Sequence, residues 1–310
     1  MLALPDKGVR RSVNEHNSKL DVFCDWIEGS ILFSEEELSE TDIVDVLLEE
    51  QIYKDQNFAS EWVTDVWAEL KRRQILTGVG SSFSIEHRKI KRLRSWQDVP
   101  AHSFCAILSF VELYDGWASR FGSDYNEQGE LFELLTQESL KCQFPGWQIY
   151  RTGWSRTTTV KLAQVVEDIQ HKLGELPGSI GPWASKYANE VGLDLLCYRP
   201  FDDNRVGIPV YLMQCASGGD WKRKLHTPDL QIWTKVVQFA ADPKKAFATP
   251  FAFLDDTFRQ TCNTVDGMLL DRYRLLAPYR HIESWESRPL KDRIIAWAEP
   301  RILALLRSDV

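Results

Sequence analysis

Two neighbouring segments near the middle of the chain each carry one oxygen-bearing side chain that could bind a metal ion. The first segment, residues 192–198, is apolar apart from Asp194. The second, residues 209–216, is mostly apolar and contains Gln214. A turn rich in Asp, Asn and Gly, residues 201–207, lies between them, and this pattern predicts a β-hairpin. An unpaired carboxylate is costly to bury in a strand, and a divalent cation is the simplest partner for Asp194.

The cysteines and histidines predict neither a zinc site nor a disulfide framework. The six cysteines are scattered and no two are separated by only two residues, and the six histidines include no pair spaced by three residues. Zinc sites and disulfide frameworks both show characteristic ligand spacing in the sequence. A cation bound by oxygen atoms is therefore the expected metal.

The composition of the chain is that of a soluble globular protein. Of its 310 residues, 44% are hydrophobic and 26% are charged, and this length suffices for one large or two ordinary domains. No apolar run approaches the ~20 residues of a membrane-spanning helix. The first residues also lack the apolar core of a signal peptide. We therefore expect a cytoplasmic protein with no membrane partner.

Positive charge is concentrated in two local patches of an acidic chain. The net charge of −8 gives no overall attraction for nucleic acid, so binding would need such a patch. One candidate combines residues 71–73 with residues 87–94, and the other is residues 222–224. Either patch could equally be a solvated helix face.

Helices are expected where apolar residues recur at three- and four-residue spacing. The segment from Ser39 to Asp42 is typical of a helix N-terminus, and the helical pattern extends to about residue 73. Residues 1–35 are mixed and polar, so no structure is assigned to them. Further helices are predicted at 59–73, 100–120, 128–141, 159–175 and 289–306, with another that begins at Trp221 and is capped by Asp220.

Strands are expected mainly in the second half of the chain. They are predicted at 148–154, in the two arms of the hairpin and at 246–254, whereas 267–273 fits a strand or a helix. The chain would then be an α+β or α/β protein. A helical N-terminal domain, residues 1–120, with a winged-helix-like arrangement as one alternative, would precede a domain with a mixed central sheet flanked by helices, residues 121–310.

Three short motifs follow one another along these elements. Residues 129–133 read Gly-Glu-Leu-Phe-Glu, residues 192–194 read Gly-Leu-Asp, and residues 214–216 read Gln-Cys-Ala. Their order resembles the PD-(D/E)XK nuclease superfamily and in particular its Mrr-like restriction enzymes, which carry Gly-x-x-Phe-Glu on a helix and Gly-x-Asp and Gln-x-Lys on later strands. The resemblance covers roughly residues 125–275 and implies a restriction-endonuclease-like core.

The resemblance implies an endonuclease that uses Mg²⁺ or Mn²⁺ to hydrolyse phosphodiester bonds of DNA in bacterial restriction or anti-phage defence. Asp194 would be the principal metal ligand, and Gln214 or its neighbouring backbone carbonyl would complete the strand side. Glu133 would reach in from the helix, with Glu130, one turn earlier, as the alternative acidic ligand. DNA is the implied partner, and the likeness also allows a homodimer and a second protein of a defence system.

One position departs from the family pattern, because Ala216 stands where the family has Lys. In the family, this lysine orients the attacking water or stabilises the transition state. Lys224, or else Lys222, could replace it, because side chains in the first turns of a helix lean towards the N-terminus; Lys224 is favoured. Without such a replacement, the domain would be an inactive scaffold or a nucleic-acid-binding subunit of a larger defence complex. An unrelated α+β protein with coincidental motifs is a third alternative.

Overall fold

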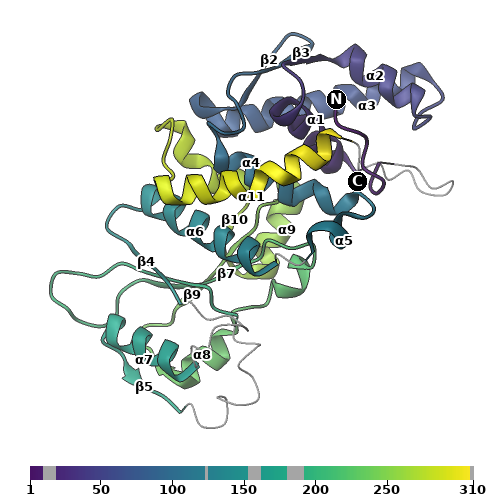
Figure 1. Cartoon of the computed structure of the whole chain (residues 1–310). Coiled ribbons are helices and arrows are strands. Elements are labelled where there is room, and N and C mark those ends of the chain that lie inside the picture. Colours follow the sequence, from purple (N-terminus) through teal and green to yellow (C-terminus); the bar gives the residue numbers. More distant parts are fainter. Residues whose placement is uncertain (10–18, 123–124, 153–161, 180–191, 308–310) are drawn as a thin grey trace. The chain divides into compact units, whose positions relative to one another are not determined.

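The computed structural model shows an α+β protein with a mixed central sheet and flanking helices (Figure 1). The structure describes residues 1–9, 19–122, 125–152, 162–179 and 192–307. The fold class expected from the sequence is confirmed at this level. No helix in these described ranges is long and apolar enough to cross a membrane.

The chain forms two units, and the first is discontinuous in sequence. The first unit comprises Met1–Tyr125, Pro250–Ala252 and Arg272–Val310, and the second comprises Asn126–Thr249 and Phe253–Asp271. The expected division placed all residues after 120 in one domain. The structure differs because the segment that begins at Arg272 packs with the N-terminal elements.

The first unit begins with three helices and a small antiparallel sheet. In chain order these elements are α1 (Leu20–Phe33), β1 (Glu37–Ser39), α2 (Glu40–Glu49), α3 (Gln56–Thr77), β2 (Phe83–Glu86) and β3 (Lys89–Arg92), and the sheet order is β1-β3-β2. The expected N-terminus of α2 is confirmed, because Ser39 and Asp42 exchange side-chain and backbone hydrogen bonds in a capping box. The second expected helix is confirmed as α3, which Asp55 caps.

Helix α1 corrects the sequence analysis, which assigned no structure to residues 1–35. Every residue from Val22 to Phe33 is buried, including the carboxylates of Asp25 and Glu28. In the sequence, these two acidic residues interrupt the apolar pattern that would otherwise have predicted a buried helix. Their burial is stable only because cationic partners from distant parts of the chain compensate them.

The partners of these carboxylates are two fully buried arginines. Nη1 of Arg73, on α3, lies 2.7 Å from Asp25 and 3.1 Å from Glu28. Nη1 of Arg272 lies 2.9 Å from Asp25 and 2.8 Å from Glu28, and its Nε donates to the Pro250 carbonyl at 3.0 Å. Burial alone would raise the pKa of Asp25, but the two guanidinium groups hold it below its ordinary value. This ion cluster joins three separate segments of the first unit.

The remaining helices of the first unit are α4 (Pro100–Phe110), α5 (Trp117–Phe121), α10 (Arg272–Leu275) and α11 (Arg288–Leu306). Helix α4 contacts both α1 and α11 (Figure 1). The ring centroids of Phe104, on α4, and Trp297, on α11, lie 4.8 Å apart. The single helix expected at 100–120 is interrupted: α4 ends at Phe110, the backbone is extended at Tyr114, and α5 begins after Gly116, whose φ is 85°. The C-terminal helix is confirmed as α11.

A five-stranded mixed sheet organises the second unit. Its order is β10-β9-β7-β6-β4, with β4 at Gln148–Arg151, β6 at Leu195–Tyr198, β7 at Val210–Cys215, β9 at Lys244–Ala248 and β10 at Gly267–Leu270. Strands β4, β6 and β7 are antiparallel neighbours, whereas β7, β9 and β10 are parallel. The expected hairpin is confirmed as β6 and β7, with Leu196 opposite Leu212.

Helices flank this sheet. They are α6 (Tyr125–Gln143), α7 (Leu162–Leu173), α8 (Leu230–Val236) and α9 (Asp255–Val265). On one face, Leu196 and Leu212 share a buried cluster with Ile169 of α7 and Trp233 of α8. Helix α6 contacts β4, where the side-chain amide of Gln137 donates to the Ile149 carbonyl at 2.7 Å. The expected helices at 128–141 and 159–175 are thus confirmed within the described residues.

Three expectations for the second half of the chain were wrong or incomplete. Residues from Trp221 form a single 3₁₀ turn, η3 (Trp221–Lys224), and the Asp220 side chain does not cap it. The strand expected at 246–254 begins and ends earlier, as β9. The ambiguous segment 267–273 contains both β10 and the start of α10.

Candidate functional site

The topology of the sheet brings three polar residues to one edge. Arg151 ends β4, Asp194 directly precedes β6, and Gln214 lies near the end of β7. Because each of these strands is antiparallel to its neighbour, these positions meet at the same edge, with Arg151 opposite Leu195 and Leu195 opposite Met213. The structure therefore brings Asp194 and Gln214 together, as the hairpin pattern predicted.

The carboxylate of Asp194 is held by hydrogen bonds from β7. Its Oδ2 accepts from the backbone N–H of Cys215 at 2.6 Å and from the side-chain amide of Gln214. The Gln214 Oε1 in turn accepts from the hydroxyl of Thr227 at 3.0 Å. Within the part of the chain that the structure describes, no hydrogen bond reaches Oδ1 of Asp194. Residues of β7 thus fix one of the two carboxylate oxygens.

Gly192 fits this arrangement for a steric reason. Its φ of 47° lies in the left-handed region, and a Cβ there would lie 2.6 Å from both Oε1 of Gln214 and Cβ of Thr227. The glycine of the Gly-x-Asp motif therefore permits the close approach that positions Gln214 against Asp194.

The carboxylate of Glu133 reaches the same edge from α6, where an arginine neutralises it. Nη2 of Arg151 lies 2.9 Å from Glu133, and its Nη1 lies 3.8 Å from Glu130. Burial raises the pKa of Glu133, and the charge of Glu130 adds to the rise, whereas Arg151 opposes it. Arg151 was not predicted as a site residue, because in the sequence it lies in the middle of the strand expected at 148–154 and nothing local marks it.

Asp194 and Glu133 are close enough to influence each other's ionisation. Burial, and then the negative charge of Glu133, raise the pKa of Asp194 to about 7. The Cys215 N–H, Lys224 and Arg151 act in the opposite direction. Two carboxylates that repel each other in this way would both be stabilised by a cation placed between them.

Of the two lysines predicted as replacements for the family lysine, Lys224 acts on Asp194, whereas Lys222 lies against the Trp221 ring. The charge of Lys224 acts on Asp194, although its Nζ lies 3.9 Å from Asp220 Oδ1. Nζ of Lys222 lies 5.6 Å from the centre of the Trp221 ring. Ala216, where the family has Lys, is fully buried and donates its N–H to the Ala248 carbonyl at 2.9 Å.

The donor set at this edge fits a hard cation such as Mg²⁺. Asp194 and Glu133 offer carboxylate oxygens. The side chain of Gln214, which the sequence predicted as a ligand, instead donates its NH₂ to Asp194 and to the Cys215 carbonyl, while its oxygen accepts from Thr227, so it orients Asp194 in this arrangement. Mg²⁺ in proteins is commonly bound through one or two carboxylates and keeps several waters. Among the described residues, no group of three or more His, Cys, Asp or Glu side chains could hold a metal ion. The site thus differs from zinc sites, which need three or four such ligands.

Without metal ion, the free energy of unfolding is expected to fall as the pH rises from about 4 to about 7. Folding raises the pKa of Asp194 from 3.8 to about 7, so the folded state binds more protons than the unfolded state in this window. Thermal unfolding in EDTA across this pH range measures the effect. Asp194→Asn should flatten the dependence, and Mg²⁺ should stabilise the wild-type protein more above pH 7 than below it. If the wild-type protein and Asp194→Asn showed the same pH dependence of unfolding, the raised pKa of Asp194 would not be its cause.

Comparisons with protein families, curated proteins and solved structures find no match for this chain. Its chemistry is therefore inferred from the geometry of the edge itself. Two interacting carboxylates, a carboxamide and two cations lie together there, and such a set can bind a divalent cation and an anionic substrate group.

Proposed function

We propose that this protein is a metal-dependent endonuclease that hydrolyses phosphodiester bonds of DNA. The observation that carries the proposal is the meeting of Asp194, Gln214 and Glu133 at one edge of a mixed sheet. The order of strands, with an antiparallel β4-β6-β7 group followed by parallel β9 and β10, supports a restriction-endonuclease-like core. Both features agree with the motifs at residues 129–133, 192–194 and 214–216.

Each residue at the edge has a role in this proposal. Asp194 and Glu133 would hold Mg²⁺ or Mn²⁺, which when bound supplies charge neutralisation and activates a water. Thr227 keeps the Gln214 side chain against Asp194. Arg151 and Lys224 would stabilise the negative charge that develops on the phosphate. The planar guanidinium of Arg151 suits two hydrogen bonds to phosphate oxygens better than an ammonium does.

We propose a recognition or partner-binding role for the first unit. The order α1-β1-α2-α3-β2-β3 supports a winged-helix-like arrangement, in which α3 would be the exposed helix. Glu61 and Asp65 are exposed on α3 and would repel DNA phosphates. This charge favours a protein partner for α3. In the proposed setting, a cytoplasmic bacterial defence system, the partner would be another component of that system.

An inactive nuclease-fold scaffold is the second candidate function. Ala216 favours it, because this fully buried position offers no room for the family lysine. In that case Asp194 and Gln214 would serve only to fix β6 against β7. A subunit of this kind would bind nucleic acid or a partner protein without cutting.

Cleavage of plasmid DNA by the purified protein tests the proposed function. Nicking or linearisation is expected with Mg²⁺ or Mn²⁺ and not with EDTA, because the carboxylates need the cation to engage the phosphate. Asp194→Ala, purified in the same way, excludes a co-purifying nuclease if it does not cut. The matched control is Asp202→Ala, an exposed carboxylate in the turn of the same hairpin, which should cut normally. A folded wild-type protein that cuts with neither metal would favour the scaffold.

A further inference from the structure

Residues 217–226, which follow β7 and are here called the basic loop, carry exposed positive charge. Lys222, Arg223 and His226 are exposed, and Lys224 is half-buried. Neither Lys222 nor Arg223 forms an ion pair with any residue in the described ranges. Unpaired cations on a surface are available to an external anion without the cost of breaking an internal pair.

Contacts at both ends and in the middle hold the basic loop beside the candidate site. The Trp221 ring is nearly buried and lies 5.1 Å from the ring of Phe253. At one end, the side-chain amide of Gln128, on α6, donates to the Ser217 carbonyl at 3.3 Å. At the other end, the Lys224 carbonyl at 2.7 Å and Gln214 Oε1 at 3.0 Å share the single hydroxyl proton of Thr227. The backbone of the basic loop is therefore held beside the candidate site, and its exposed cations Lys222 and Arg223 project from it.

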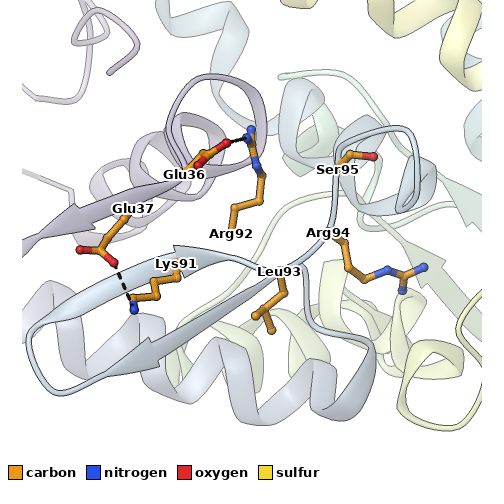
Figure 2. A pocket seen from close by; sticks show the side chains of 7 residues that line it. All are labelled: Glu36, Glu37, Lys91, Arg92, Leu93, Arg94 and Ser95. Atoms are coloured by element: carbon orange, nitrogen blue, oxygen red, sulfur yellow. Dashed lines mark ion pairs between the residues drawn. The ribbon is translucent and has the colours of Figure 1, made fainter.

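The other basic segment, the hairpin formed by β2 and β3, differs because internal carboxylates occupy its cations. Figure 2 shows Lys91 paired with Glu37 and Arg92 paired with Glu36. The N···O distances are 3.2 and 3.6 Å, and these residues line a hollow of about 450 Å³. Arg88 is also paired, with Glu40 of α2 at 2.6 Å. A phosphate would have to displace these carboxylates.

Of the basic residues at 71–73, Lys71 is exposed and forms no ion pair within the described ranges, whereas carboxylates engage the other two. Arg73 is fully buried in the ion cluster with Asp25 and Glu28. Nε of Arg72 lies 2.7 Å from Glu69. Of the two basic patches in the sequence, the structure thus leaves the one at residues 222–224 as the better candidate for binding phosphate.

We infer that the basic loop binds the DNA backbone next to the phosphate that is to be cleaved, through Lys222 and Arg223. This inference rests on the proposed nuclease function and adds the surface that positions the substrate. The loop begins at the end of β7, near Gln214, so a duplex bound there would run past the carboxylate of Asp194. Contacts of this kind are insensitive to base sequence and strongly dependent on salt.

Binding of a labelled DNA duplex in EDTA, measured by fluorescence anisotropy at several salt concentrations, tests the inference without cleavage. Lys222→Gln with Arg223→Gln should weaken binding and reduce the slope of log K against log salt by about 1 per residue. Two control pairs should leave the slope unchanged. Lys141→Gln with Lys244→Gln removes exposed charge elsewhere in the second unit, and Arg88→Gln with Lys89→Gln removes it from the hairpin.

The outcomes separate this inference from the proposed function. The inference would be overturned if the loop variant kept the salt slope of the wild-type protein. It would also be overturned if the hairpin variant lost more DNA affinity than the loop variant, or if the wild-type protein did not bind DNA. If the slope falls as expected but the wild-type protein does not cut DNA, the loop binds the backbone and only the nuclease proposal fails. Equal thermal unfolding of all the variants would show that the changes in binding do not arise from misfolding.

Discussion

Asp194→Ala is expected to reduce metal-dependent DNA cleavage to below detection. Loss of a residue that only supports a metal ligand costs about 10- to 100-fold, and removal of the principal ligand should cost more. The variant also removes the acceptor of hydrogen bonds from Gln214 and Cys215. Cleavage rates in Mg²⁺ and DNA affinity in EDTA, measured on the same preparations, separate loss of chemistry from loss of binding. Wild-type cleavage by the variant would exclude Asp194 from the reaction.

Arg151→Ala is expected to lose cleavage only in part, in contrast to Asp194→Ala. We expect cleavage to fall about 100- to 1000-fold, as for removal of one group that stabilises charge in a transition state. The pKa values of Glu133 and Asp194 should also rise, because Arg151 opposes both shifts. Arg199→Ala, an exposed arginine beyond the other end of β6, is the matched control and should cut normally.

Lys224→Ala decides which cation carries the role of the missing family lysine. A large loss in this variant together with near-normal cleavage by Arg151→Ala would assign that role to Lys224, as expected from the sequence. The opposite pattern would assign it to Arg151. Intermediate losses in both would indicate that the two cations share the charge of one phosphate.

Arg272→Met is expected to destabilise the first unit by about 3–5 kcal/mol, the usual cost of removing one partner from a buried ion pair. Arg272 is fully buried and lies within 3 Å of both Asp25 and Glu28, which would lose one of their two guanidinium partners. Urea unfolding followed by circular dichroism and tryptophan fluorescence measures the change.

The matched control for this variant is Arg288→Met. The Arg288 side chain is 90% exposed and its Nε lies 3.8 Å from Asp292, so the substitution should change the free energy of unfolding by at most about 1 kcal/mol. Equal, small effects of the two substitutions would mean that Asp25 and Glu28 do not depend on Arg272 for their burial.

Local patterns were sufficient to predict the elements that carry the candidate site. Two apolar runs on either side of a polar turn predicted the hairpin of β6 and β7, and with it the meeting of Asp194 and Gln214. The apolar stripe of α6 specified the helix that carries Glu133. These predictions succeed because each depends on residues close together in the sequence. The backbone geometry of a helix or strand fixes which of these residues share a face.

The remaining features depend on contacts between distant residues, which a single sequence does not contain. Helix α1 was missed because Asp25 and Glu28 look like solvent-facing residues unless Arg272 is known to reach them. Arg151 was missed because nothing local shows that β4 pairs with β6 and places it beside Glu133. The extended helix expected after Asp220 was wrong: without a side-chain cap from Asp220, residues 221–224 form a short 3₁₀ turn, and Trp221 packs against Phe253.

The ion cluster also has a consequence for how the protein is made. Asp25 and Arg272 are 247 positions apart, and the residues of the second unit lie between them. A ribosome therefore releases α1 and α3 long before the arginine that completes their core, whereas the second unit is already fully synthesised by then. Folding during translation would thus finish in the middle of the chain first, in contrast to the usual order in which N-terminal domains fold before later ones.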